Sequence, residues 1–151
     1  MLASNAPDLK EPLLVTQLIE KHGATRLDEA GFEAFVAAPG EAALFFTENP
    51  VRFREVLDVA VIVPELAAAA SRRFRIGVLP PPLANAKAST YGVRRWPALV
   101  FVRAGEWLGN VEGLRDWGDY LAAVNELVEG EPRPLPARVI PVAVAGAPSC
   151  A

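Results

Sequence analysis

Hydrophobic residues recur along the first half of the chain in two different patterns. In residues 13–22 and 29–38 they return at every third or fourth position, which predicts two amphipathic helices, the second capped by Asp28. In residues 41–47 they form a continuous run, which predicts a strand buried at the centre of a sheet. The short segment 24–27 between the two helices predicts an edge strand. This order of elements indicates an α/β domain.

The second half of the chain continues the alternation and includes a hairpin. Residues 53–70 keep the helical spacing although Pro64 interrupts it, so we expect a kinked helix there. Asp116 and Asp119 predict a capping arrangement at the start of the last helix, with Trp117 on its inner face. The other predicted elements are a strand at residues 74–79, a weak helix at about 83–90 and a β-hairpin formed by 98–102 and 106–111.

Together these elements predict an α/β fold with a central mixed β-sheet of four to five strands flanked by about four helices. A crossover through a helix makes two strands parallel and a hairpin makes them antiparallel, so both kinds of pairing are expected. We expect the domain to span residues 12–130, between a flexible N-terminus at 1–11 and a flexible tail at 131–151. Five prolines and an apolar run without helical spacing distinguish that tail.

Composition places the chain among ordinary globular domains. Of its 151 residues, 52% are hydrophobic and 22% are charged, which suits one domain with a hydrophobic core. No stretch approaches the roughly 18 consecutive apolar residues of a membrane helix, and the N-terminus lacks the pattern of a secretory signal. We therefore expect a cytoplasmic protein without membrane insertion.

Charge is unevenly distributed along the chain, although the formal net charge is only −3. Residues 28–65 hold eight acidic side chains and two arginines, a net of −6. Residues 66–103 hold seven basic side chains and no acidic one, a net of +7. Such an asymmetry is compatible with a charged surface for a partner, and also with charges that pair across the fold.

Few residue patterns point to catalysis or to a cofactor. His22 is the sole histidine and closes a helix, and Cys150 is the sole cysteine and stands beside the last residue. This leaves no basis for a nucleophilic triad, an internal disulfide or a metal site with several cysteine or histidine ligands. No glycine-rich phosphate-binding motif occurs, so nucleotide binding has no support. We expect no catalytic residue, no cofactor, no metal and no nucleic acid partner.

The segment 91–113 resembles the second half of a thioredoxin domain. It contains a Tyr-Gly-Val sequence, a short loop that ends in Trp96-Pro97, an apolar strand, a turn and a second strand that ends in glycine. Thioredoxins have these features in the same order. The resemblance implies a cis peptide bond before Pro97. The base rate alone would favour a trans bond, because most X-Pro bonds in folded proteins are trans.

The resemblance also locates the place of the thioredoxin cysteines. Their helix follows the central strand and carries a proline about five residues after the second cysteine, so counting back from Pro64 gives Val56 and Val59. Neither position holds a thiol. The chain therefore cannot exchange disulfides by the known dithiol route.

In thioredoxin-like proteins, the loop before the cis-proline and the start of the kinked helix form a groove for extended peptides. The resemblance places six residues of this chain at that groove: Arg95, Trp96 and Pro97 on one side, and Glu55, Asp58 and Glu65 on the other. We interpret them as a peptide-binding site with an aromatic wall and an acidic lip. The alternative is that Trp96 covers the core and the acids are solvated helix charges.

Longer sequence elements resemble the hydrogenase expression/formation accessory proteins of the HyaE/HupG type. The matching elements are REVLDVAVIVPELAAAASRRFRIGVL, YGVRRWPALVFVRAGEWLG and GLRDWGDYL, and the similarity covers about residues 13–128. It implies a non-enzymatic chaperone in the maturation of an uptake NiFe hydrogenase. The implied partners are the hydrogenase small subunit precursor with its twin-arginine signal peptide, bound before export, and other hydrogenase accessory proteins. In that role Glu55, Asp58 and Glu65 bind the arginines and Trp96 binds the apolar part.

Two other functions are compatible with the residues themselves. The chain could be a thioredoxin-like adaptor for an unrelated client protein. It could also be a thiol oxidoreductase that uses Cys150, but this requires the tail to fold over the groove and lacks a second cysteine.

Overall fold

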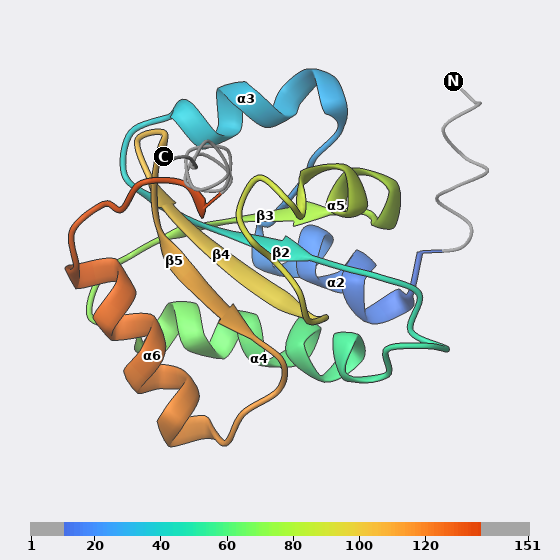
Figure 1. Ribbon diagram of the computed structural model, residues 1–151. Coiled ribbons are helices and arrows are strands. Elements are labelled where there is room, and N and C mark those ends of the chain that lie inside the picture. Colours follow the sequence, from blue (N-terminus) through green and yellow to red (C-terminus); the bar gives the residue numbers. More distant parts are fainter. Residues whose placement is uncertain (1–10, 137–151) are drawn as a thin grey trace, which may run out of the picture.

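The computed structural model describes residues 11–136, which form a mixed five-stranded β-sheet with helices on both faces (Figure 1). The strands lie in the order β1-β3-β2-β4-β5. Their bounds are Thr25–Arg26 for β1, Glu41–Phe46 for β2, Arg75–Leu79 for β3, Ala98–Arg103 for β4 and Glu106–Glu112 for β5. The mixed sheet expected from the sequence is thus confirmed.

The sheet combines parallel and antiparallel pairing because two kinds of connection join its strands. Helices α3 (Glu29–Ala37) and α4 (Glu55–Ala69) connect β1 to β2 and β2 to β3, and these three strands run parallel. A tight turn joins β4 to β5, which are antiparallel. Strand β4 also pairs antiparallel with β2, in a register that places Ala98 opposite Phe46.

Alternating residues of the strands face two separate cores. Phe45 belongs to the core on the face covered by α2 (Leu13–His22), α4 and α6 (Trp117–Glu129). Its neighbour Leu44 belongs to the core on the opposite face, under α3 and α5 (Pro81–Lys87). Figure 1 shows the two groups of helices on either side of the sheet. Residues 11–136 thus hold five helices where the sequence suggested about four.

The first turns of two helices differ in part from the sequence-based expectation. Helix α5 begins at Pro81, two residues earlier than expected, because the first helical turn does not need the N–H that proline lacks. The Asp116 side chain makes no capping hydrogen bond to α6, and Trp117 is 46% exposed instead of facing the core. Helix α6 thus begins directly after Asp116, as expected, but the expected capping hydrogen bond and the inward position of Trp117 were wrong. The cap expected at Asp28 is present, since its carboxylate accepts a hydrogen bond from the Gly31 amide at 2.7 Å.

The charges of the acidic and basic segments pair with one another across the fold. Three of the four ion pairs between described side chains join these two segments: Arg72 with Glu41, Arg103 with Glu41, and Lys87 with Glu29. Burial by itself would raise the pKa of Glu41, but the hydrogen bond from Arg103 and the charges of both arginines hold it below its ordinary value. Arg103 also donates to carbonyl oxygens at the end of α6. Part of the charge asymmetry is therefore neutralised within the domain.

Residues 131–136, assigned to the tail from the sequence, run beside the edge strand β5. The Arg133 amide donates to the carbonyl oxygen of Trp107 at 2.7 Å in an isolated antiparallel bridge, and Leu135 packs against the core under α3 and α5. These contacts attach the first part of the tail to the sheet. Most of the expected N-terminal segment, and the rest of the tail with Cys150, lie outside the described residues.

Candidate functional site

The cis-proline loop and the segment before α4 meet at the carboxyl end of β2. The indole nitrogen of Trp96 donates a hydrogen bond of 3.1 Å to the carbonyl oxygen of Thr47, the first residue after β2. The Trp96 ring also packs against Phe53, with 6.4 Å between the ring centroids. The Arg52 guanidinium lies 5.2 Å from the centroid of the same Phe53 ring. An aromatic pair thus joins the two segments that the sequence assigned to a groove.

The sheet register positions the cis-proline loop. The peptide bond between Trp96 and Pro97 is cis, and Pro97 directly precedes β4. The Gly113 amide, just after β5, donates to the Pro97 carbonyl oxygen at 2.8 Å. The Glu112 carboxylate accepts hydrogen bonds from the backbone amides of Arg94 and Arg95. Strands β4 and β5 therefore hold this loop from one side, while Thr47 holds it from the other.

The structure separates the six sequence-predicted site residues into different environments. On the loop, Pro97 is buried, Trp96 is half-buried and Arg95 is exposed. On α4, Glu55 and Asp58 are exposed and share a face in the first turn of the helix. Glu65 is exposed too, but ten residues of helix place it about 15 Å along the axis from Glu55. Glu65 therefore lies well away from the start of the helix.

Buried apolar side chains occupy the two thioredoxin cysteine positions at the start of α4. Val56 and Val59, which occupy the thioredoxin cysteine positions by sequence spacing, are both 0% exposed and belong to the core under α2, α4 and α6. They form part of the hydrophobic core, so no reactive group faces the groove at these positions.

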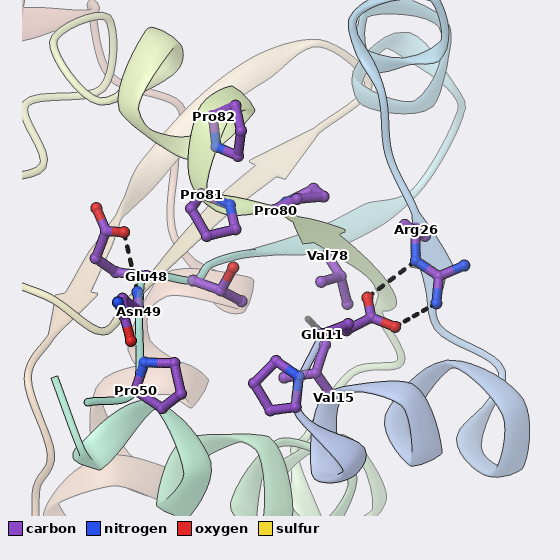
Figure 2. Close-up of a pocket in the computed structure, with 12 residues that line it drawn as sticks. Glu11, Val15, Arg26, Glu48, Asn49, Pro50, Val78, Pro80, Pro81 and Pro82 are labelled. Carbon is purple, nitrogen blue, oxygen red and sulfur yellow. Dashed lines mark hydrogen bonds and ion pairs between the residues drawn. The ribbon is translucent and has the colours of Figure 1, made fainter. Parts of the chain in front are cut away.

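A pocket of about 590 Å³ lies beside this junction and was not anticipated from the sequence. Its walls come from four separate segments: the start of α2, the end of β1, the residues after β2, and the end of β3 with the start of α5. Its lining residues are Glu11, Pro12, Val15, Arg26, Thr47, Glu48, Asn49, Pro50, Val78, Pro80, Pro81 and Pro82. Figure 2 shows Glu11 and Arg26 on one side of the pocket, and Glu48 and Asn49 on the other.

The polar groups of the pocket are held by hydrogen bonds. Arg26 donates to both carboxylate oxygens of Glu11, and the Thr16 hydroxyl donates to one of them (Figure 2 shows the Arg26 contacts). Burial would raise the pKa of Glu11, but these hydrogen bonds and the Arg26 charge hold it below its ordinary value. On the other side, the Glu48 carboxylate accepts from the Asn49 amide at 2.9 Å and from the Asn85 side chain at 2.8 Å. The pocket thus presents two ordered carboxylates and one guanidinium.

No single motif could have revealed this pocket. The three consecutive prolines, Pro80 to Pro82, are the one local signal, and by themselves they indicate only the end of a strand. The other walls are brought together only by the parallel pairing of β1, β3 and β2. Thr47 belongs to both features, because it lines the pocket and accepts the hydrogen bond from Trp96.

Neither a metal centre nor a membrane-spanning helix occurs among residues 11–136. Residues 11–136 contain no group of three or more histidine, cysteine, aspartate or glutamate side chains placed to hold a metal ion. None of the helices in that range combines the length and apolar character that crossing a lipid bilayer requires.

Comparison with known proteins places this arrangement in a family. The family model described as Hydrogenase-1 expression protein HyaE matches residues 14–120, which include all but the first residue of α2, the pocket lining except Glu11 and Pro12, α4 and the cis-proline loop. The chain belongs to the HyaE family. This confirms the resemblance drawn from the sequence.

Named relatives of this HyaE-family protein agree with the assignment. The hydrogenase expression/formation protein HoxO of Cupriavidus necator is 35% identical over 138 residues, covering 90% of this chain and 86% of the relative. The hydrogenase expression/formation protein HupG of Bradyrhizobium diazoefficiens is 36% identical over 115 residues, covering 74% and 78%. Both relatives are thus matched over most of their length.

The fold is shared with thioredoxin. A solved thioredoxin variant from Halobacterium salinarum superposes with a TM-score of 0.54 at 20% identity, covering 72% of this chain and 94% of the other. At that identity the likeness concerns the fold alone. The HyaE-family protein therefore has a thioredoxin-like fold, with a single cysteine that lies outside residues 11–136.

Proposed function

We propose that this protein is a non-catalytic chaperone in NiFe hydrogenase maturation. It binds the hydrogenase small subunit precursor and its twin-arginine signal peptide in the cytoplasm, before export. The observation that carries the proposal is the match of the HyaE family model to residues 14–120, supported by relatives whose names describe hydrogenase expression and formation.

The absence of a thiol pair from the thioredoxin position supports a binding role over a catalytic one. Val56 and Val59 are fully buried there, so the cis-proline loop has no redox partner on α4. A fold that keeps the loop and lacks the dithiol is suited to hold an extended segment without chemical change. Other hydrogenase accessory proteins are further proposed partners.

The proposed contact residues are those exposed around the junction. Glu55 and Asp58, adjacent on the first turn of α4, face the arginines of the signal peptide. Trp96 faces its apolar part, and Arg95 and Pro97 shape the loop. Glu65 joins the site only if the peptide extends about three helical turns along α4.

Co-expression with the small subunit precursor tests the proposal. The tagged protein should retain the precursor on an affinity column, and deletion of the signal peptide should abolish that retention. A complex that survives the deletion would contradict signal-peptide binding and favour another surface of the small subunit. If no precursor is retained at all, the protein serves a different client and the hydrogenase role is wrong.

Charge reversal tests the acidic lip. The double variant E55K and D58K should weaken precursor binding at least tenfold at low salt, with a smaller effect at high salt because screening already reduces the attraction. The matched control reverses two exposed acids of α6, E126K and E129K, and should leave binding unchanged. Adding E65K to the double variant measures whether the peptide reaches the middle of α4.

A further inference from the structure

The pocket beside the cis-proline loop lies where the connections of two parallel strands diverge. After β2 the chain continues to α4 on one face of the sheet, whereas after β3 it continues to α5 on the opposite face. Strands β2 and β3 are neighbours, so their connections leave a crevice between them at their carboxyl ends. Ligands of open α/β sheets bind at such divergence points.

The size and lining of the pocket suit an apolar group. About 590 Å³ falls within the range of ligand-binding cavities in proteins. Five of the lining residues are prolines, and two more, Val15 and Val78, are aliphatic side chains of the buried core. Because prolines have no N–H and little conformational freedom, these walls are apolar and already ordered before a ligand arrives.

The charges of the lining suit a cation next to that apolar group. Two carboxylates, Glu11 and Glu48, stand against the single guanidinium of Arg26, which leaves a net charge of −1. Arg26 already lies against Glu11, so the Glu48 side is the side with uncompensated negative charge. An anionic ligand such as a phosphate would meet this carboxylate and is disfavoured.

A peptide segment that carries an apolar side chain next to a basic one supplies this combination. The apolar side chain would lie against the proline walls of the pocket, and the basic group would face Glu48.

We propose that this pocket receives an apolar side chain of the client's extended segment, with an adjacent basic residue at Glu48. The inference rests on the proposed function for its client, but it assigns the anchoring position to the pocket and not to the acidic lip on α4. The hydrogen bond from Trp96 to Thr47 then connects the two positions.

A synthetic peptide tests this assignment. The probe carries two adjacent arginines followed by a phenylalanine and a run of leucine and alanine, and its affinity is measured by calorimetry. The pocket variant P81W places a large ring at the half-buried first residue of α5, and E48Q removes one carboxylate with little change of shape. The matched controls are V51W, at an exposed residue outside the lining, and E126Q, at an exposed residue of α6.

We expect P81W to weaken peptide binding at least tenfold and E48Q about fivefold, with V51W unchanged. Replacing the phenylalanine of the probe by serine should weaken binding to the wild type and have little further effect on P81W. In amide NMR spectra the peptide should shift the signals of Arg26, Thr47 and Val78, together with the indole signal of Trp96. Thermal unfolding of each variant verifies that it is folded.

Two results would overturn the pocket assignment. One is equal affinity of P81W, E48Q and wild type for the probe, and the other is a set of NMR shifts confined to α4 around Glu55. If the full precursor is still retained in either case, the chaperone function stands and only the pocket is wrong. If the wild type retains no precursor, the proposed function fails, whatever the probe does.

Discussion

The indole N–H of Trp96 donates to the carbonyl oxygen of Thr47 at 3.1 Å, and this contact joins the cis-proline loop to the end of the central strand. Thr47 is buried, its amide donates to Leu79, and its hydroxyl donates to the same carbonyl oxygen. The Trp96 contact therefore completes a hydrogen-bonded corner between β2, β3 and the loop before β4. Removing one donor leaves a buried carbonyl oxygen without this partner.

Replacement of Trp96 by phenylalanine tests that corner. The variant W96F keeps an aromatic ring near Phe53 but removes the donor, so we expect a loss of about 1 to 2 kcal/mol in the free energy of unfolding. Urea denaturation measures it. The matched control is W117F at the 46% exposed start of α6, which should change stability by less than about 0.5 kcal/mol. Equal effects of the two substitutions would mean that the hydrogen bond to Thr47 contributes little.

Glu41 should control part of the acid stability of the protein. Its pKa in the folded state is lowered, so its stabilisation is present above its ordinary pKa and is lost as pH falls through the folded value. The variant E41Q leaves Arg72 and Arg103 without their carboxylate, and we expect it to be about 1 to 3 kcal/mol less stable at pH 7. The difference from wild type should shrink when unfolding is measured at progressively lower pH.

The control for Glu41 is E129Q at the exposed end of α6. It should follow the wild-type stability at every pH. A constant difference between E41Q and wild type down to strongly acidic pH would contradict an electrostatic origin and indicate a packing effect.

Tyr120 offers a substitution that should not destabilise the fold. Its hydroxyl is buried without a hydrogen-bond partner among the described residues, and burial raises its pKa to about 12. The variant Y120F removes an unsatisfied polar atom, so the free energy of unfolding should stay the same or rise by about 1 kcal/mol. If Y120F instead has a lower free energy of unfolding than the wild type, measured by thermal or urea unfolding, the hydroxyl has a hydrogen-bond partner in solution.

Gly109 should not tolerate a side chain. It has a φ of +144° beside the irregularity between β4 and β5, and a Cβ atom there would lie 2.7 Å from the Leu127 side chain of α6. We expect G109A to lower the free energy of unfolding by about 2 kcal/mol through strain and overpacking. The control G118A lies in α6 with open space around it and should raise stability by up to about 1 kcal/mol, since alanine favours the helix. Comparable stability of both variants would contradict the close approach at Gly109.

The fold could be anticipated because its elements leave local traces. Continuous apolar runs marked β2 and β4, and helical spacing marked α2 and α4, so the order of elements and the mixed sheet followed from connection rules. Errors arose where a helix end depends on tertiary contacts. Trp117 fits the helical pattern of α6, but the first turn extends past the sheet and leaves its ring exposed.

The site could be anticipated only in part. The resemblance to thioredoxin identified the cis-proline loop, because its residues are contiguous and keep a characteristic spacing. The pocket escaped because Glu11, Arg26, Thr47 and Pro81 are distant in the chain and carry no shared motif. Their meeting depends on the parallel register of β1, β3 and β2, which sequence spacing does not specify.

The burial of Val56 and Val59 bears on whether a redox function could be restored to this fold. Both side chains are 0% exposed, so thiols introduced by V56C and V59C would be sealed inside the core. Neither a reductase nor a client disulfide could reach them, and low polarity around them would disfavour the thiolate. Re-creating a thioredoxin would require rebuilding the entrance to α4. This protein differs from a thioredoxin in lacking the access route to the reaction centre as well as its sulfur atoms.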